Sequence, residues 1–574
     1  MVDSEINWLV VDECIRDAHT ENAPAVIAGS SCSKLRFIGI SKRGAVESRM
    51  VGVKSLRAAT LLLFSPALLA QQSQWVHPGA KGHLIYGRDK SGATIPDYSF
   101  AGYHAGGVAL PTVSAQINLS PAGGDDTAAI QRAIDTLSAR PLDASGSRGA
   151  VQLAPGVFHC SAALVLAASG VVLRGAGSGA GHDATTISQT GDPHAGIIIK
   201  GNFALSTVAP ATNITDPYVP FGAHTVHVAD ATHIHAGDLV QISKPVTVAW
   251  IEYMGMSGLE RPDRDEHWID GILTARRVVT AVDGHAVTFQ IALMDSYDSK
   301  FLGAEHFTVQ PVAVSGQLKE VGVENLRIVA PAVSVGFHDA HSVGMEINAA
   351  ADSWVRNVAM IDTTEGVYMD FNSERITLTR DDVEESKTVT SSAKSFNYLI
   401  DGTQVLVDRA TAIGDSVFYF ATGRRQQGPI VILNSVFHGN GNLEPHQRWS
   451  TGLLVDNCAV AEGGIHFVNR GNMGSGQGWA IGWGVVWNST ASDFVIQQAP
   501  GTITWAMGNR GEVKSEGMPD GKGGRVHGTP LPSGLIESQG KPVTPQSLYL
   551  FQLAERLGPD ALKNIGYTSA DPVH

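Results

Sequence analysis

The stretch GAVQLAPGVFHCSAALVLAASGVVLRGAG, residues 149–177, decides the fold. It consists of short apolar runs separated by Gly, Pro, Ser and Ala, a pattern that predicts short strands joined by tight turns. Similar runs recur at irregular intervals in GVENLRIVAP (322–331), TQVLVDRATAIG (403–414) and GPIVILNSVFHGNG (428–441). Repetition of short strands with connections of unequal length indicates a strand solenoid, in which each turn packs on its neighbours.

A helix is expected immediately before this stretch, in GGDDTAAIQRAIDTLSAR (123–140). Asp125 or Asp126 can cap its first turn. Its apolar residues recur at helical spacing, namely Ala129, Ile130, Ala133, Ile134 and Leu137. We expect a helix over 125–140 to cover the open end of the solenoid, because an uncapped end exposes apolar side chains and unpaired strand edges.

The helical block, the following G-x-V-x-L-x-P-G-V-F pattern and V-V-L-R-G-A-G together resemble the opening of the pectate-lyase-like superfamily. The resemblance covers Gly107 to Gly511 and implies an all-β fold, a single-stranded right-handed parallel β-helix with an N-terminal capping helix. Blocks such as GVENLRI and EPHQRWSTGLL are similar to bacterial secreted members of this group. Because the fold hosts lyases, hydrolases, isomerases and phage tailspikes, the resemblance predicts architecture better than it predicts a reaction.

Further regions flank or interrupt the β-helix, which we expect over 116–515. Residues 71–115 form a loop-like N-terminal region with short strands, and residues 246–271 interrupt the strand pattern as a loop insertion. The C-terminal tail, 516–574, contains a short amphipathic helix at 545–558, which we expect to pack on the solenoid.

The N-terminal part of the chain has the layout of a targeting signal. Met50 opens MVGVKSLRAATLLLFSPALLAQQ, in which Lys54 and Arg57 precede an apolar run that ends before Ala70. This layout predicts a signal peptide over 50–70 and a secreted or periplasmic protein, and the run is too short to span a bilayer. Residues 1–49 would then be an upstream extension, with translation starting at Met50.

Two cysteines, Cys160 and Cys458, fall within the predicted β-helix, and Cys14 and Cys32 fall in the upstream extension. Their spacing forms no zinc or redox motif. Cys160 and Cys458 could be two buried thiols, or a disulfide in an exported protein.

The composition excludes several classes of protein. With 63 Gly among 574 residues and only 17% charged residues, the chain is neither a coiled coil nor a charge-driven disordered protein. Its net charge of −14 argues against nucleic acid as a partner. An anionic ligand would therefore need a local basic site or a bound cation.

The densest group of chemically active residues lies in GNLEPHQRWSTGLLVDN (441–457), which contains Glu444, His446, Arg448, Trp449 and Asp456. Arg424 and Arg425 end a strand one turn earlier. If both loops open on one face, they form the local basic site that an acidic sugar needs. A lyase would use arginine to neutralise the uronate carboxylate and a base to remove the C5 proton.

We therefore expect His446 and Arg448 to be the base and the acid, with either residue in either role, Arg425 the carboxylate clamp, and Asp370 a Ca²⁺ or polar ligand. His446 is the residue whose ordinary pKa suits proton exchange near pH 7. The alternative is structural, with His446 and Arg448 pairing with Glu444 and Asp456 to hold the loop.

A second acidic group consists of Asp362, Glu365 and Asp370. Carboxylates on adjoining turns of a solenoid can lie about 5 Å apart. They could bind Ca²⁺, serve as the paired acid and base of a hydrolase, or be solvated loop charges. HDAH, with His338 and His341, lacks the third ligand that a metal site needs.

Aromatic residues could form sugar-binding platforms, because flat apolar faces of pyranoses match aromatic rings. The candidates are Trp250, Tyr253 and Trp268 in the insertion, Trp449, and Trp483 in a glycine-rich block that also holds Arg470, Trp479 and Trp487. The alternative is that these rings anchor loops to the solenoid.

Taken together, these features predict a secreted lyase that cleaves a polyuronide by β-elimination, with Arg424, Glu444 and the aromatic residues contacting the chain. Ca²⁺ is a candidate cofactor, and the expected assembly is a monomer or a homotrimer. A glycoside hydrolase of the same fold and a non-catalytic carbohydrate-binding solenoid remain as alternatives.

Overall fold

A computed structural model gives the structure of the protein, and it describes residues 7–11, 36–40, 46–50, 71–259, 268–391, 393–519 and 529–568. The chain forms two compact units, Met1–Leu69 and Ala70–His574. In the first unit an antiparallel sheet contains β1 (Asn7–Val11), β2 (Arg36–Ile40) and β3 (Val46–Met50). Beyond Met50 the predicted signal peptide lies outside the described residues, as do Cys14 and Cys32.

The second unit is built on a 29-stranded parallel sheet that coils into a β-helix with three faces. Face A contains β7 (Ala115–Leu119), β8 (Gly149–Leu153), β11 (Val171–Arg174), β28 (Glu374–Thr379), β31 (Val405–Asp408), β34 (Gln427–Leu433), β37 (Ser450–Asp456), β39 (Ile481–Gly482), β40 (Val485–Trp487), β42 (Trp505–Met507) and β44 (Leu535–Glu537). Face B contains β9 (Gly156–Cys160), β12 (Thr185–Gln189), β29 (Asp382–Glu384), β32 (Thr411–Ile413) and β35 (Val436–His438).

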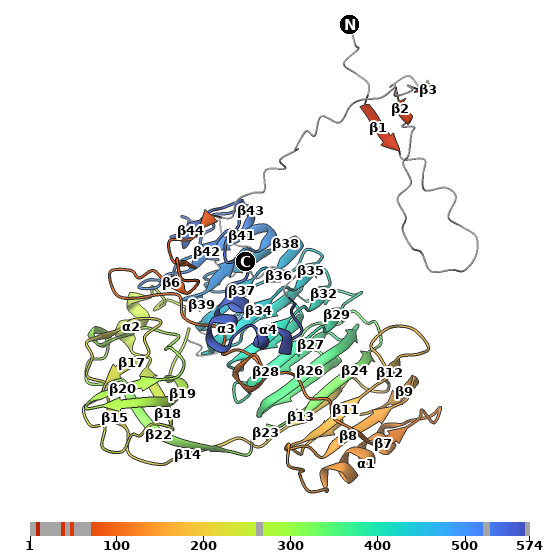
Figure 1. Cartoon of the computed structure of the whole chain (residues 1–574), viewed down its shortest axis with the longest axis horizontal. Coiled ribbons are helices and arrows are strands. Elements are labelled where there is room, and N and C mark those ends of the chain that lie inside the picture. Colours follow the sequence, from red (N-terminus) through yellow and green to blue (C-terminus); the bar gives the residue numbers. More distant parts are fainter. Residues whose placement is uncertain are drawn as a thin grey trace. The chain divides into compact units, whose positions relative to one another are not determined.

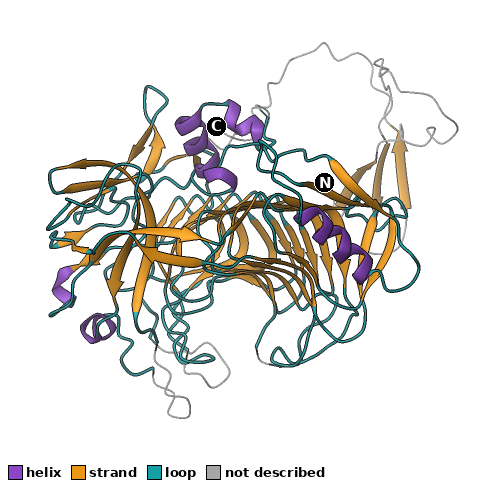
Figure 2. Cartoon of the chain, turned by 90° about the horizontal axis from the view of Figure 1, so that it is seen from below, coloured by secondary structure: helices purple, strands orange, loops and turns teal. Residues whose placement is uncertain are grey.

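Face C carries the site described below. It contains β10 (Leu164–Leu166), β13 (Ala195–Lys200), β25 (Val343–Asn348), β27 (Glu365–Met369), β30 (Phe396–Ile400), β33 (Phe418–Ala421) and β36 (Asn442–Leu443). Longer strands bend from one face to the next, namely β24 (Gly322–Val329), β26 (Ala350–Ile361), β38 (Ala459–Phe467) and β41 (Thr490–Ile496). The short β23 (Leu318–Lys319) pairs with β26, and β43 (Arg510–Val513) pairs with β41. These stacked parallel strands, visible in Figure 2, confirm the predicted parallel β-helix.

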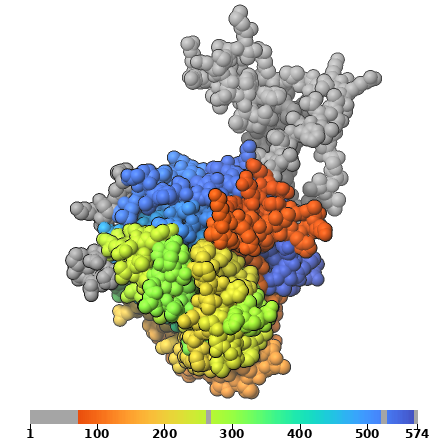
Figure 3. Space-filling view, turned by 90° about the vertical axis from the view of Figure 1, so that its left-hand side faces the viewer, coloured from red at the N-terminus to blue at the C-terminus, as the bar shows by residue number. Residues whose placement is uncertain are grey.

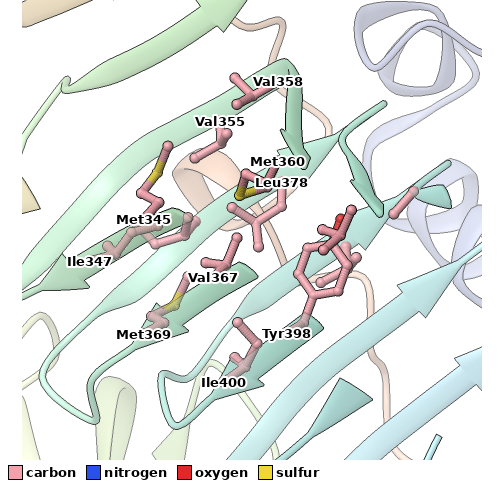
Figure 4. Close-up of a cluster of buried hydrophobic side chains, with 14 of the residues drawn as sticks. Met345, Ile347, Val355, Val358, Met360, Val367, Met369, Leu378, Tyr398 and Ile400 are labelled. Carbon is pink, nitrogen blue, oxygen red and sulfur yellow. The ribbon is translucent and has the colours of Figure 1, made fainter. Parts of the chain in front are cut away.

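Equivalent positions of successive turns stack to form the core. On face C, Met345 pairs in register with Val367, which pairs with Tyr398. All three side chains are buried in one apolar cluster, part of which Figure 4 shows. Each turn buries apolar side chains only by contact with its neighbours, which is why the short apolar runs of the sequence predict a solenoid.

Helix α1 (Thr127–Ser138) covers the first turn, as predicted from the sequence. Its apolar face is buried in the solenoid core, through Ile130, Ala133, Ile134 and Leu137. Asp126 fixes the segment just before the helix, because its carboxylate accepts hydrogen bonds from the backbone N–H groups of Ala122 and His159.

The predicted loop insertion is part of a much larger inserted domain, which lies between β13 and β23. Its antiparallel sheet contains β14 (Ala204–Thr207), β15 (Thr212–Asn213), β17 (Thr225–His227), β18 (Leu239–Pro245), β19 (Ile272–Asp283), β20 (Ala286–Phe289) and β22 (Thr308–Ser315). Beside it lie β16 (Tyr218–Val219), β21 (Tyr297–Asp298), α2 (Val248–Tyr253) and η3 (Ser299–Phe301). Figure 3 shows this domain in yellow and green.

The limits 246–271 and the assignment of the flanking strands to the β-helix are therefore wrong. β18 alternates between buried and half-buried residues, and β19 follows a similar alternation. Such alternation is typical of an antiparallel sheet with one solvated face. The β-helix in turn extends beyond residue 515, because β44 pairs with β42.

The two ends of the second unit pack together along the solenoid. α3 (Leu548–Leu557) and α4 (Asp560–Asn564) follow β45 (Val543–Thr544), which pairs with β4 (Gln71–Gln72). The N-terminal region adds β5 (Val76–Pro78), β6 (Leu84–Tyr86) and η2 (Tyr103–Ala105). The buried face of α3 joins a cluster that includes Tyr98 and Trp505, so the predicted C-terminal helix does pack on the solenoid.

Cys160 and Cys458 are both buried free thiols, so they form no disulfide. Among the described residues, no helix combines the length and the apolar composition needed to cross a bilayer.

Candidate functional site

A basic groove lies where the strands of face C end and the chain turns into face A. Three consecutive turns, residues 370–373, 401–404 and 422–426, form one side of it. Strand β19 of the inserted domain forms the other side. The groove contains a cavity of about 370 Å³ with these lining residues: Ile272, Thr274, Ala275, Arg276, Arg277, Phe371, Asp401, Thr403, Arg424, Arg425, Gln426 and Gln427.

Two carboxylates lie on neighbouring turns beside the groove, and that of Asp401 lines it. Met369 pairs in register with Ile400, so Asp370 and Asp401 follow equivalent positions of neighbouring parallel strands. Such strands lie about 4.8 Å apart. The Asp370 carboxylate accepts hydrogen bonds from Ala349 N–H, Ser373 Oγ and Asn372 Nδ2 at 3.0, 2.7 and 3.2 Å.

Asp401 is the titratable group of the groove. Its pKa is raised to about 7, mainly by burial and also by the charge of Asp370, although a hydrogen bond from the backbone N–H of Gly423 and the charge of Arg424 lower it. A Cβ at position 423 would collide with the Asp401 carboxylate, so glycine is required for this close approach. Asp401 is thus divided between its neutral and charged forms near neutral pH.

Four arginines line the same cavity as this carboxylate. Arg424 is exposed and forms no hydrogen bond or ion pair with any described residue. Arg425 pairs with Asp270, and Arg276 lies 3.4 Å from Glu374. The groove therefore offers positive charge in a protein whose overall charge is negative.

Arg277 lies deeper than the other three arginines. It is buried, and its guanidinium donates to the backbone carbonyls of Ala292, Arg276 and Gly428 rather than to a carboxylate. Burial lowers its pKa to about 10, so it remains protonated at neutral pH. A buried cation held by carbonyls adds positive potential to the groove above it.

Several buried polar atoms of the lining lack a partner among the described residues. They are Thr403 Oγ1, Arg425 Nε, Gln426 Oε1, and both amide atoms of Gln427. A buried polar group without a partner costs free energy, so such a cluster favours a polar ligand or ordered water. Phe371 supplies an apolar surface to the groove, because 67% of the residue is exposed.

The site predicted around His446 is a packed network, not an open site. The amide of Gln477 donates to His446 Nε2 at 2.9 Å, and the His446 ring packs against Phe396 and Phe418. Burial, and then the charge of Arg470, lower the pKa of His446 to about 3. The expected proton exchange by His446 near pH 7 is therefore wrong, because the imidazole stays neutral there.

The loops that contain Arg425 and Arg448 are hydrogen-bonded through their backbones, but the two side chains have different surroundings. The backbone N–H of Arg425 donates to the carbonyl of Arg448 at 2.9 Å. Arg425 lines the groove, whereas the Arg448 guanidinium donates to Gln447 and to the carbonyl of Ser475. The structure thus brings Arg424 and Arg425 together without His446 or Arg448.

Glu444 and Asp456 hold other parts of the fold. Glu444 is buried and pairs with Arg470, and its second oxygen lies 3.4 Å from His466. Asp456 accepts hydrogen bonds from Ser547 and from the backbone of Tyr549. The charge of Glu444 acts on His446, and Glu444 is too buried for the expected contact with substrate.

Four of the predicted aromatic platforms are buried. Trp250, Trp268, Trp449 and Trp483 are at most 6% exposed, and they pack where the inserted domain meets the solenoid. Trp479 and Trp487 are buried too. A buried ring has no free face for a sugar, so the stacking role is wrong for these residues. Tyr253 keeps 42% of its surface exposed.

The acidic residues at the other end of β27 do not pair with Asp370. Glu365 begins β27 and Asp370 follows its last residue, so they lie about 16 Å apart along the strand. Glu365 instead lies 3.8 Å from His341, and Asp362 accepts from the Ser386 backbone. The predicted hydrolase pairs of Asp370 with Asp362 or Glu365 are therefore wrong.

Within the described ranges, no group of three or more His, Cys, Asp or Glu side chains is arranged to hold a metal ion. The carboxylate of Asp370 is already bonded to three protein groups. These residues do not fit the predicted Ca²⁺ site.

Sequence reasoning missed Asp401, Phe371, Arg276 and Arg277. A signal existed for Asp401, because GVYMDF and FNYLIDG both end an apolar strand with Asp, which places Asp370 and Asp401 at equivalent points of adjoining turns. No local signal links Arg276 to the groove, since the inserted domain brings it there.

The structure is similar to solved β-helix proteins at low identity. The tailspike protein gp49 from Pseudomonas phage LKA1 matches with a TM-score of 0.34 and 15% identity, over 68% of this chain and 69% of that one. The A-module of mannuronan C-5 epimerase AlgE6 from Azotobacter vinelandii matches with a TM-score of 0.31 and 12% identity, over 74% and 98%. DFA-IIIase from Arthrobacter chlorophenolicus A6 matches with a TM-score of 0.30 and 10% identity, over 74% and 93%.

No protein-family model matches the sequence, and no curated protein matches it either. Membership of the pectate-lyase-like superfamily therefore stays a prediction.

Proposed function

We propose that the protein is an enzyme that cleaves an acidic polysaccharide by β-elimination in the basic groove. The observation that carries this proposal is the Asp401 carboxyl, with its pKa of about 7, in a cavity lined by Arg276, Arg424 and Arg425. Such a site offers a proton acceptor beside fixed positive charge, which is what elimination from a uronate requires.

The reaction follows from these charges. Arg424 and Arg425 bind the uronate carboxylate and stabilise the negative charge that develops when the C5 proton leaves. Asp401, in its charged form, accepts that proton. The electron pair of the C5–H bond forms the C4–C5 double bond, the C4–O bond breaks, and protonated Asp401 or water returns a proton to the departing oxygen.

In this proposal Arg425 keeps its predicted role as the carboxylate clamp and Arg424 its role in substrate binding. Asp401 replaces His446 and Arg448 as the acid and base. Asp370 acts through its charge, which raises the pKa of Asp401. Phe371 is the aromatic residue of the groove whose exposure allows contact with sugars.

A glycoside hydrolase is the second candidate, and the spacing of Asp370 and Asp401 favours it. Retaining glycosidases hold two carboxyl groups about 5 Å apart, close to the spacing of the two strands that carry these residues. Protonated Asp401 would donate to the leaving oxygen, and Asp370 would be the nucleophile. The three hydrogen bonds that Asp370 accepts weaken it in that role.

Product analysis separates these reactions. Purified protein is incubated with pectate, alginate and glucuronan, and the enol-ether absorbance and new reducing ends are followed together. We expect both signals to rise on at least one chain. Reducing ends without the absorbance would establish hydrolysis, and no product on any chain would favour a non-catalytic, carbohydrate-binding solenoid.

Variants test whether the groove is the site. Asp401→Asn should lower turnover at least about 100-fold, and Arg424→Ala should raise KM at least about tenfold, since a charge-assisted hydrogen bond to the substrate is lost. Asp135→Asn, on the exposed face of α1, is the matched control and should leave turnover unchanged. Full activity of Asp401→Asn would contradict the proposal.

A further inference from the structure

A second cavity, of about 530 Å³, lies where the inserted domain meets the C-terminal turns of the solenoid. Residues 244–254 and 296–307 line it from the inserted domain, and residues 498–503 line it from the solenoid. Its volume falls in the range of small-molecule sites. None of its lining residues lines the basic groove.

Tyr253 provides an aromatic surface in this cavity. Its ring lies 4.6 Å from that of Phe301, centroid to centroid, and the Lys300 ammonium lies 5.2 Å from the Tyr253 centroid. Gly501, with a φ of 71°, passes close to the tyrosine, and a Cβ there would lie 3.0 Å from its hydroxyl. The ring is therefore held by its neighbours, yet 42% of the residue stays exposed.

Uncharged hydrogen-bonding groups accompany this ring. Gln498 is half-buried, and its side-chain amide has no hydrogen-bond partner among the described residues. The indole N–H of Trp483, which is 1% exposed and lines the cavity, also lacks one. Buried donors of this kind favour a ligand or water that carries hydroxyl or other acceptor oxygens.

The lysines that line this cavity are paired with carboxylates, whereas the basic groove is lined by more arginines than carboxylates. Lys244 is paired with Asp295 at 2.9 Å and Lys300 with Asp298 at 2.6 Å. The remaining charged lining residue, Asp89, accepts from Ser91 and from the backbone of Ala93. An anionic sugar would find no unpaired cation among these lining residues.

We propose that this cavity is a second saccharide site, which binds neutral pyranose units through Tyr253, Gln498 and Trp483. An exposed aromatic face with uncharged hydrogen-bonding groups is suited to a pyranose, whose C–H face is apolar and whose rim carries hydroxyls. The site is distinct from the basic groove. We expect it to bind saccharides without cleaving them, so a binding measurement tests it.

Binding is measured on the full chain with cellobiose, maltose and mannobiose as neutral probes and digalacturonate as the acidic probe. Tryptophan fluorescence is a suitable readout, because Trp250, Trp449 and Trp483 line the cavity. We expect a saturable change with at least one neutral disaccharide. Tyr253→Ala should weaken it about tenfold and Gln498→Ala about threefold, because each removes one contact.

Phe371→Ala is the matched control, since it removes an exposed aromatic ring from the other site and should leave neutral binding unchanged. Circular dichroism and the melting temperature verify that each variant is folded. The proposal is overturned if no neutral disaccharide binds, if Tyr253→Ala binds as tightly as the unmodified chain, or if digalacturonate binds with an equal Kd through Tyr253.

Discussion

At the residue scale, Asp401 and His446 exchange the roles that their residue types suggest. Burial penalises the charged form of both side chains, so it raises the pKa of the carboxyl to about 7 and lowers that of the imidazole to about 3. The charge of Asp370 also raises the pKa of Asp401, and the charge of Arg470 also lowers that of His446. The carboxyl, and not the imidazole, therefore titrates near neutral pH.

The pH dependence of turnover follows from Asp401. As the base of β-elimination it must be charged, so the initial rate should rise as pH rises through about 7, the pKa of the group. Asp401→Asn should remove this inflection and lower the rate at least about 100-fold. The rate on an acidic polysaccharide, measured at constant ionic strength, checks this.

Two outcomes would contradict that assignment. A rate that falls above pH 7 would show that the protonated carboxyl is the active form, as the hydrolase candidate requires. An inflection that survives in Asp401→Asn would show that another group titrates.

At the scale of elements, two helices protect parts of the solenoid that its strands leave open. α1 covers the first turn, and α3 packs along the side of the later turns. Neither helix belongs to the repeat, so each depends on a few anchoring residues. Ile134 anchors α1 in the core, and Asp456 receives the first turn of α3.

Truncation of the α1 anchor should destabilise the solenoid from its N-terminal end. Ile134 is fully buried, so Ile134→Ala should lower the free energy of unfolding by about 2–4 kcal/mol, which urea unfolding would measure. Arg132→Ala, on the exposed face of the same helix, is the control and should change it by less than about 0.5 kcal/mol. Equal effects would mean that α1 does not act as a cap.

Asp456 should make the docking of α3 dependent on pH. Burial raises its pKa to about 7, so between about pH 4 and pH 7 the folded state binds a proton that the unfolded chain releases. The contribution of this group to stability is therefore lost as pH rises through that window, and the melting temperature should fall. Asp456→Asn keeps an acceptor for Ser547 without the charge.

That variant should show a smaller decrease in melting temperature between pH 5 and pH 8 than the unmodified chain. Asp135→Asn, at an exposed position, should keep the full decrease. An unchanged pH dependence in Asp456→Asn would assign the effect to other buried carboxyls, such as Asp401.

At the scale of the whole molecule, the inserted domain creates both proposed sites. β19 brings Arg276 and Arg277 to the turns of face C, and the segment around α2 brings Tyr253 to the C-terminal turns. The solenoid alone would present a row of turns with one open side. A polysaccharide chain could therefore meet a basic and a neutral site on the same protein.

The predicted export concerns the whole chain. The second compact unit begins at Ala70, the residue after which the sequence predicts cleavage. We expect the mature protein to begin at Gln71, and a chain that starts there should have the same melting temperature as the full chain. N-terminal sequencing of protein recovered outside the cytoplasm tests the first point, and a mature chain that retains residues 1–49 would contradict it.

Much of the architecture could be predicted from the sequence, because it depends on local patterns. Short apolar runs with intervening turns predict stacked strands, and the helical spacing of Ile130, Ile134 and Leu137 predicts the cap. The adjacent Arg424 and Arg425 predict a basic site, since consecutive residues at the end of a strand stay together in any fold. The alternation in β18 and β19 was a local signal that the prediction missed.

Only the tertiary structure decided which residues form the site and how they titrate. Arg276 reaches the groove through the inserted domain, and the pKa of Asp401 depends on burial and on Asp370 of the neighbouring turn. His446 and the tryptophans lost their expected roles because distant segments cover them. Burial and electrostatic coupling arise from contacts between residues far apart in sequence, and no local pattern records them.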